Sequence, residues 1–127
     1  MCEIKFRVWD NIAKKYIDSR YVSISGLGLL HVAKRIIKNC FRPPHTRKNP
    51  WFIVEQFTGL RDKNGTEIYE GDILIDDTGE PIEYWVVKFS EGSFIGECAG
   101  VAEPLFELTQ LEVVGNIHEN SELVEEK

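Results

Sequence analysis

The chain of 127 residues is long enough for one domain, or for two small subdomains that share a core. Hydrophobic residues make up 43% of it and charged residues 28%, which is typical of a globular protein and excludes a disordered one. No apolar run approaches the roughly 20 residues that a membrane span needs, and the charged N-terminus lacks the apolar core of a secretion signal. Three cysteines without paired spacing argue against a disulfide framework and predict a reducing, cytoplasmic location.

The formal net charge of -6 conceals an uneven distribution. Residues 1–54 hold 11 Lys or Arg and 3 Asp or Glu, a net charge of +8, whereas residues 55–127 hold 4 and 18, a net charge of -14. Three interpretations stay open. The two halves neutralise each other within one monomer, or the basic segment of one subunit contacts the acidic half of another, or the basic segment forms a face for nucleic acid.

The N-terminal part, residues 1–57, is predicted to be a β meander with one helix. Alternation over 4–9 predicts a half-buried strand with Trp9 on its exposed face, and one or two further strands follow over 16–25. Over 27–40 the apolar residues recur at helical spacing, and Pro43-Pro44 ends any helix before them, so we expect a helix there. A basic, proline-rich loop and an aromatic strand over 51–57 complete this part.

The stretch TGLRDKNGTEIYEGDIL (58–74) predicts a hairpin followed by a sharp corner. Gly59 allows a bulge, and Asn64-Gly65 is a strong hairpin signal through a type I′ turn, which needs positive φ at both central positions. Gly71 interrupts the return strand and predicts a bend, where Asp72 can cap the backbone.

Further strands are predicted over 82–89, 94–98 and 108–117, followed by a short helical turn. In the first of them Trp85, Val87 and Phe89 share one face. Short strands with frequent turns indicate a small barrel or sandwich. The predicted fold class is therefore mainly β with one α-helix: an N-terminal β meander plus helix packed on a small SH3-like β-barrel over 58–127, the whole forming one compact unit.

Four stretches resemble the YopX family, small proteins encoded by bacteriophages and prophages: 3–10, 56–74, 86–94 and 112–123. The resemblance implies a phage or prophage origin, a bacterial host cell, a mainly β fold with a barrel-like C-terminal part, and no catalytic activity to carry over, because the family has no established one. Ser121 stands where the family usually has proline, which loosens the last turn. The residues that carry the pattern are interpreted as structural: Thr58, Gly59, Leu60, Asp62, Asn64, Gly65, Ile68, Tyr69, Gly71, Asp72, Gly115, Asn116, Ile117 and Asn120.

Carboxylates that could serve a small hydrolase are Asp62, Glu67, Glu70, Asp72, Asp76 and Asp77. A glycosidase or a metal-dependent nuclease needs two of them to converge in a cleft, whereas acids in turns and on strand faces are usually only solvated. The histidines and cysteines are too far apart for a CxxC or HxxxH zinc pattern. We therefore expect no catalytic residues, no metal and no cofactor.

The candidate contact for nucleic acid or a partner is the basic loop with its neighbouring rings: Arg42, Arg47, Lys48, Trp51 and Phe52. Cations for phosphates and rings for bases are what a single-strand binder needs. The leading hypothesis is a non-enzymatic interaction module that forms a homo-oligomer and can also bind a phage or host protein. The alternatives are a single-strand nucleic-acid binder and an acidic DNA mimic that inhibits a host protein.

Overall fold

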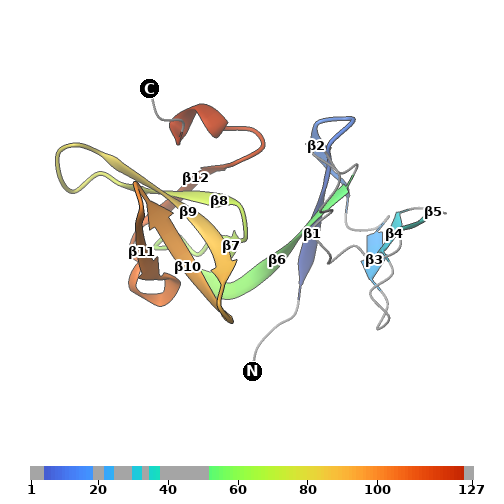
Figure 1. Cartoon of the computed structure of the whole chain (residues 1–127), viewed down its shortest axis with the longest axis horizontal. Coiled ribbons are helices and arrows are strands. Elements are labelled where there is room, and N and C mark those ends of the chain that lie inside the picture. The colour runs from blue at the N-terminus through green and yellow to red at the C-terminus, as the bar shows by residue number, and fades with distance from the viewer. Residues whose placement is uncertain (1–4, 19–21, 25–29, 33–34, 38–51, 125–127) are drawn as a thin grey trace. The chain divides into compact units, whose positions relative to one another are not determined.

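The computed structural model of the chain describes residues 5–18, 22–24, 30–32, 35–37 and 52–124 (Figure 1). The chain divides into two compact units. The N-terminal unit is Phe6–Glu55, and the C-terminal unit joins Met1–Lys5 to Gln56–Lys127. Both units consist of antiparallel strands joined by turns, so the prediction of a mainly β protein is confirmed.

In the N-terminal unit, β1 (Phe6–Asp10) lies between β2 (Lys15–Tyr16) and the start of β6 (Phe52–Arg61). The turn between β1 and β2 is held by Asp10, whose Oδ1 accepts the N–H groups of Ile12 and Ala13. A separate three-stranded sheet has the order β3-β4-β5, with β3 at Val22–Ile24, β4 at Leu30–Val32 and β5 at Arg35–Ile37.

The predicted helix over 27–40 is wrong for the part of it that the structure describes, because β4 and β5 are antiparallel strands with Val32 opposite Arg35. The apolar residues here include Val32, Ile36 and Ile37, whose branched side chains lose rotamer freedom in a helix and suit strands. A short apolar segment is compatible with one helix and with two short paired strands. Here the backbone hydrogen bonds between β4 and β5 favour the strands.

The prediction that Trp9 is exposed is also wrong, since its side chain is only 2% exposed. Its ring meets the ring of Tyr16 edge-on, with centroids 5.0 Å apart, and its Nε1 donates to Asn11 Oδ1. Val8, its neighbour on the opposite face of β1, is buried as well. Strand β1 is thus buried on both faces, and the alternation in its sequence reflects Arg7 rather than a solvent-exposed side.

The C-terminal unit contains the rest of β6 and its hairpin partner β7 (Glu67–Tyr69), followed by a five-stranded antiparallel sheet in the order β11-β10-β9-β8-β12. The strands are β8 (Asp72–Asp76), β9 (Glu83–Ser90), β10 (Ser93–Cys98), β11 (Val101–Pro104) and β12 (Glu112–Asn116). Two short 3-10 turns, η2 (Leu105–Glu107) and η3 (Ser121–Leu123), follow β11 and β12. The predicted strands and the last helical turn are confirmed with shifted ends, whereas β11 and η2 were not predicted.

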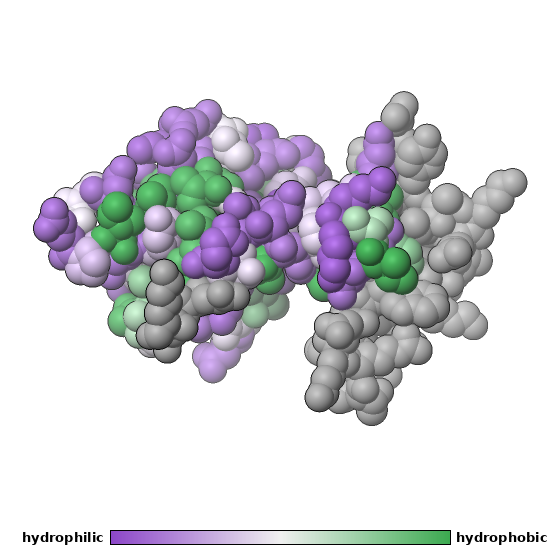
Figure 2. Space-filling view, turned by 90° about the horizontal axis from the view of Figure 1, so that it is seen from above, coloured by the Kyte–Doolittle hydropathy of each residue, from purple (hydrophilic) through white to green (hydrophobic). Residues whose placement is uncertain are grey.

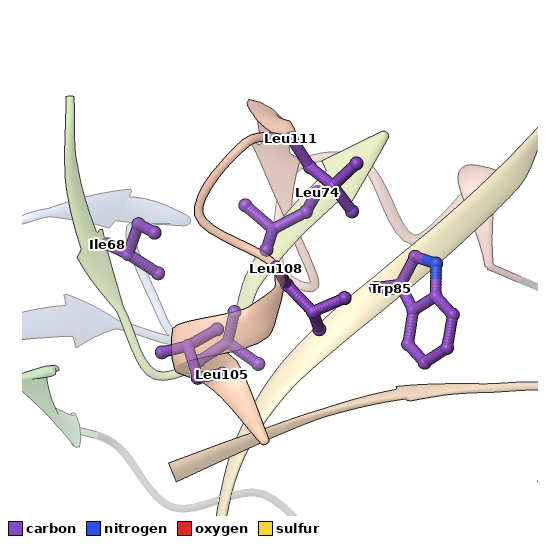
Figure 3. Packing of buried hydrophobic residues seen from close by; sticks show 7 residues of the cluster. Ile68, Leu74, Trp85, Leu105, Leu108 and Leu111 are labelled. Atoms are coloured by element: carbon purple, nitrogen blue, oxygen red, sulfur yellow. The ribbon is translucent and has the colours of Figure 1, made fainter. Parts of the chain in front are cut away.

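The core of the C-terminal unit lies between one face of this sheet and the segment after β11 (Figure 3). Ile68, Leu74, Trp85 and Val87 come from the strands, and Leu105, Leu108 and Leu111 come from η2 and the residues after it. A Cβ atom on Gly96 of β10 would lie 2.3 Å from Leu108 Cδ1, so this leucine fills the space that a side chain on β10 would need.

Candidate functional site

The family pattern DKNG surrounds a buried carboxylate, Asp62, which is 6% exposed. Its Oδ1 accepts the backbone N–H groups of Asn64 and Thr66, at 2.8 and 2.9 Å. Its Oδ2 accepts the N–H of Val113 in β12, also at 2.9 Å. One carboxylate therefore shapes the β6–β7 loop and ties it to a strand 51 residues away.

Burial alone raises the pKa of Asp62, but the backbone N–H groups of Val113, Thr66 and Asn64 together outweigh it and hold the pKa below the ordinary 3.8. The side chain thus stays ionised at neutral pH. An ionised group with every oxygen engaged by backbone donors suits a structural role rather than proton transfer.

The loop adopts a different turn from the predicted type I′. Among the residues of this loop, positive φ is confined to Gly65, at +83°, and the Gly65 N–H donates to the Asp62 carbonyl. The Asp62 side chain, by binding the Asn64 and Thr66 N–H groups, imposes a longer loop in which only the glycine is left-handed. The pair of positive φ angles that a type I′ turn requires occurs instead at Glu91-Gly92 and at Ala99-Gly100.

The corner between β7 and β8 is built as predicted. Gly71 has a φ of +84°, and the Asp72 Oδ2 accepts the Tyr69 N–H at 2.8 Å. The Gly71 backbone joins two other segments, since its N–H donates to the Val87 carbonyl and its carbonyl accepts the Ile117 N–H. The IYEGD pattern is therefore a junction of β7, β9 and the segment after β12.

Thr58 and Gly59 shape the middle of β6. The Thr58 hydroxyl donates to the Ile68 carbonyl and accepts the Leu60 N–H. Gly59 has a φ of +86°, and the register between β6 and β7 shifts between Phe57 and Arg61. This is the bulge that the glycine predicts, and the threonine hydroxyl replaces a regular ladder bond there.

The GNI-EN pattern closes the end of the chain on itself. Asn116 Oδ1 accepts the N–H groups of His118 and Glu119, and its own N–H donates to Asn120 Oδ1 at 3.2 Å. A Cβ atom on Gly115 would lie 2.3 Å from that Asn120 oxygen, so only glycine lets the two asparagines meet.

We expect Gly115→Ala to lower the free energy of unfolding by about 1–2 kcal/mol, because Asn120 must move away from the new methyl group and release the Asn116 N–H. Thermal unfolding should show a fall in Tm of several degrees. Gly79→Ala is the matched control, since a methyl group added there would meet nothing within 4 Å beyond its chain neighbours and its φ is not positive. Equal Tm values for the two variants would contradict this account of the turn.

A charged centre lies beside Phe57 in the C-terminal unit. Glu67 accepts hydrogen bonds from Lys5 and Arg61, and the Lys5 ammonium and the Arg61 guanidinium each lie within 6 Å of the Phe57 ring centroid, at 5.4 and 5.9 Å. The hydrogen bond from Lys5 is the main cause that holds the pKa of Glu67 below its usual value. Two cations, one carboxylate and a ring form a compact group with a net charge of +1.

The N-terminal unit has its own charged centre around Glu55, which is 4% exposed. Its Oε1 accepts hydrogen bonds from Arg7 Nε and from the Tyr16 hydroxyl, both at 2.8 Å. The Arg7 guanidinium also lies over the Tyr16 ring, at 4.5 Å from its centroid. A buried carboxylate that is satisfied by a cation and a phenol holds β1, β2 and β6 together.

Two further candidate carboxylates bind neighbouring backbone or hydroxyl groups. Glu70 accepts the Gln56 N–H, and Asp76 accepts from the Thr78 hydroxyl and N–H, with the hydroxyl bond the main cause that lowers the pKa of Asp76. Burial, followed by the charge of Glu83, raises the pKa of the Cys98 thiol, which is not activated as a nucleophile. Within the described ranges no three His, Cys, Asp or Glu side chains gather closely enough to hold a metal ion.

The basic loop with Arg42, Arg47, Lys48 and Trp51 lies outside the described residues, so its candidacy stays a prediction. Phe52, at the start of β6, is described and is half-buried. No helix in the described part of the chain is long and apolar enough to cross a membrane.

Sequence reasoning missed the apolar side chains that remain on the surface of the C-terminal unit. Figure 2 shows hydrophobic surface between hydrophilic residues there. The large exposed apolar residues of this unit are Ile82, Phe89, Val101, Phe106, Val114 and Ile117, with exposed fractions from 38% to 67%. Phe89 and Val101 lie near strand ends, Phe106 lies in η2, Val114 lies within β12, and Ile82 and Ile117 flank strands.

Comparison with known proteins matches the chain to a family model and to solved structures. The family model described as YopX protein matches residues 5–125. The crystal structure of protein EF1440 from Enterococcus faecalis is similar over 98% of this chain and 100% of that chain, with 25% sequence identity and a TM-score of 0.62. No curated protein matches the chain.

Proposed function

Because the chain belongs to the YopX family, whose shared pattern here forms turns and junctions, we propose that it is a non-enzymatic interaction module whose first partner is a second copy of itself. The observation that carries the proposal is the charge division, +8 over residues 1–54 and -14 over residues 55–127. Two copies can join the basic part of one to the acidic part of the other, and such a contact needs no catalytic group.

The hydrogen bonds made by the family residues support an interaction module rather than an enzyme. Asp62, Asp72 and Asn116, the polar members of the pattern that are buried, all bind backbone N–H groups. They hold the loops of the C-terminal unit in place. Because they are buried, other residues form the surface of this unit. The proposal includes the SH3-like barrel expected for this unit, for which the five-stranded antiparallel sheet with η2 packed on β10 is the support.

The proposed setting is the cytoplasm of a bacterial host, with the protein serving a phage or prophage as an accessory. The support is the resemblance of the four stretches to phage and prophage proteins. The free thiol of Cys98 is compatible with a reducing compartment.

The expected result is an oligomer at low salt whose molar mass, measured by light scattering after size exclusion, falls toward the 14.6 kDa of one chain as salt is raised. Salt screens charges that remain partly exposed, and the Debye length shortens from about 10 Å at 0.1 M to about 3 Å at 1 M. A mass of one chain at every salt concentration would rule out self-association.

A second candidate function is binding of single-stranded nucleic acid through Arg42, Arg47, Lys48, Trp51 and Phe52. The observation that favours it is that residues 19–54 contain no acidic residue and include the rings of Trp51 and Phe52. It predicts a salt-sensitive complex with a short single-stranded DNA that disappears when the three cations become Ala. A monomer that changes mass only when DNA is added would make this the function and would set aside self-association.

A further inference from the structure

The end of the β9–β10 hairpin presents a pair of aromatic rings. Phe89 in β9 lies opposite Phe94 in β10, and their rings meet edge-on with centroids 5.0 Å apart. Phe94 packs against the core, while Phe89 is 54% exposed. Both residues lie on the sheet face that carries Trp85 and Val87, with Phe94 at the edge of the core and Phe89 largely outside it.

A third phenylalanine reaches the same end of the sheet from η2. Pro104 lies opposite Ile95, so η2, which starts at Leu105, follows next to the part of β10 that holds Phe94. Leu105 is buried in the core, whereas Phe106 is 67% exposed. We call Phe89, Phe94 and Phe106 the phenylalanine patch. Phe89 and Phe106 are both largely exposed near this end of the sheet, and we take them with Phe94 as a candidate contact surface.

The surroundings of the phenylalanine patch are acidic. Glu91 occupies the β9–β10 turn, Glu107 follows Phe106, and both are exposed. In the described part of the chain neither carboxylate forms an ion pair. The nearest cation in sequence, Lys88, lies on the other face of β9 and donates to Glu97 at 2.9 Å. The patch thus combines aromatic rings with uncompensated negative charge.

We propose that the phenylalanine patch is the acceptor surface for the basic N-terminal part of a second copy, whose Arg or Lys side chains stack on the rings and pair with Glu91 and Glu107. This rests on the proposed self-association and assigns its acidic side. A cation over an aromatic ring beside a carboxylate gains from both contacts at once. Residues 19–54 supply seven cations and no acid: Arg20, Lys34, Arg35, Lys38, Arg42, Arg47 and Lys48.

The same charges argue against two other occupants. Nucleic acid would bring phosphates toward Glu91 and Glu107, and two patches facing each other would oppose these same carboxylates across the interface. Among contacts between two copies, these charges favour a head-to-tail one, in which one copy contributes the patch and the other contributes its basic part. Such a heterologous contact closes into a ring or continues as a filament.

The first test compares Phe89→Ser with Phe106→Ser in the full chain, by sedimentation equilibrium at low salt. Each should raise the dissociation constant of self-association about tenfold or more, as expected for aromatic residues central to an interface. Val101→Ser is the matched control, because Val101 is 52% exposed in the same sheet but lies opposite Cys98, at the other end of β10. It should change the constant by no more than about twofold. If all three variants had equal effects, or if none had an effect, the proposal would be overturned. An oligomer of the wild type would still support self-association in that case.

The second test asks whether the contact is head-to-tail. The double variant Phe89→Ser/Phe106→Ser lacks the acceptor, and the triple variant Arg42→Ala/Arg47→Ala/Lys48→Ala lacks much of the donor. Each should be monomeric alone, and an equimolar mixture should give a dimer of one double and one triple variant, since each retains the surface that the other lacks. A mixture that stays monomeric, or a triple variant that still self-associates like the wild type, would overturn the proposal. A wild-type chain that is monomeric at every salt concentration would overturn both this proposal and the proposed function.

Discussion

Asp62→Ala is expected to lower the free energy of unfolding by about 3 kcal/mol, because it removes a charged acceptor and leaves buried backbone donors without partners. Three N–H groups, those of Asn64, Thr66 and Val113, lose their acceptor at once. Water can reach the exposed loop residues more easily than the Val113 N–H in β12. The loss should therefore spread from the β6–β7 loop to the β8–β12 pairing, measured by urea denaturation and by amide hydrogen exchange.

The pH dependence of stability gives an independent measure of the same carboxylate. Its pKa in the folded chain lies below the ordinary value of 3.8, so the folded state favours the ionised form more strongly than the unfolded state does. The stabilisation is therefore present above pH 3.8 and is lost as pH falls through the lowered pKa. The difference in free energy of unfolding between the wild type and Asp62→Ala should therefore be large above pH 3.8 and should shrink at low pH, where Asp62 is protonated.

Asp77→Ala is the matched control, since Asp77 is exposed in the β8–β9 loop. It should leave the free energy of unfolding within about 0.5 kcal/mol of the wild type. If Asp62→Ala were as mild as this control, the carboxylate would not be the tie between the hairpin and β12.

Leu108→Ala is expected to destabilise the C-terminal unit by about 3 kcal/mol, because it opens a cavity among Leu105, Leu111 and Trp85. Gly96→Ala is expected to cost about 1–3 kcal/mol for the opposite reason, since its methyl group would lie 2.3 Å from Leu108 Cδ1.

The double variant tests whether these two sites share one space. With Leu108 shortened, the methyl group at residue 96 enters the vacated volume, so the double variant should be less destabilised than the two single variants added together. Urea denaturation of the four chains measures the coupling. Strictly additive losses would show that Leu108 does not pack over β10.

Local chemistry made the hairpin and the corner predictable from sequence. Gly59 and Gly71 take the positive φ that their places in the pattern predict, and Asp72 caps the neighbouring backbone. These features depend on a few adjacent residues, which is the range over which sequence reasoning works. The turn type at Asn64-Gly65 was wrong because Asp62 binds the loop from the side and because its second anchor, Val113, lies in a distant strand.

Long-range packing decided what the sequence could not reveal. The segment 27–40 has apolar spacing that suits a helix, yet its described residues, Leu30–Val32 and Arg35–Ile37, pair as β4 and β5. The expected face of Trp85, Val87 and Phe89 exists, but only the first two are buried in the core, and Phe89 is 54% exposed. The alternation of side chains along one strand indicates which of them share a face. It does not indicate how far the layer packed on that face extends.

The buried polar residues of the family pattern are not part of the proposed phenylalanine patch, whose Phe89 and Phe94 lie in the family-like stretch 86–94. Asp62, Asp72 and Asn116 bind backbone groups inside the C-terminal unit. None of these hydrogen bonds involves the exposed residues of the proposed contact, which are Phe89, Glu91, Phe106 and Glu107. A fold held by buried acceptors can carry different surfaces, so partner choice is expected to follow the second set rather than the first.

Sedimentation equilibrium of the full chain over a salt series, from about 50 mM to about 500 mM, shows whether copies associate through opposite charges. The association constant should fall steadily as salt rises, because a basic part and an acidic part of different copies attract each other. An association constant that does not change with salt, or a mass of 14.6 kDa throughout, would contradict it.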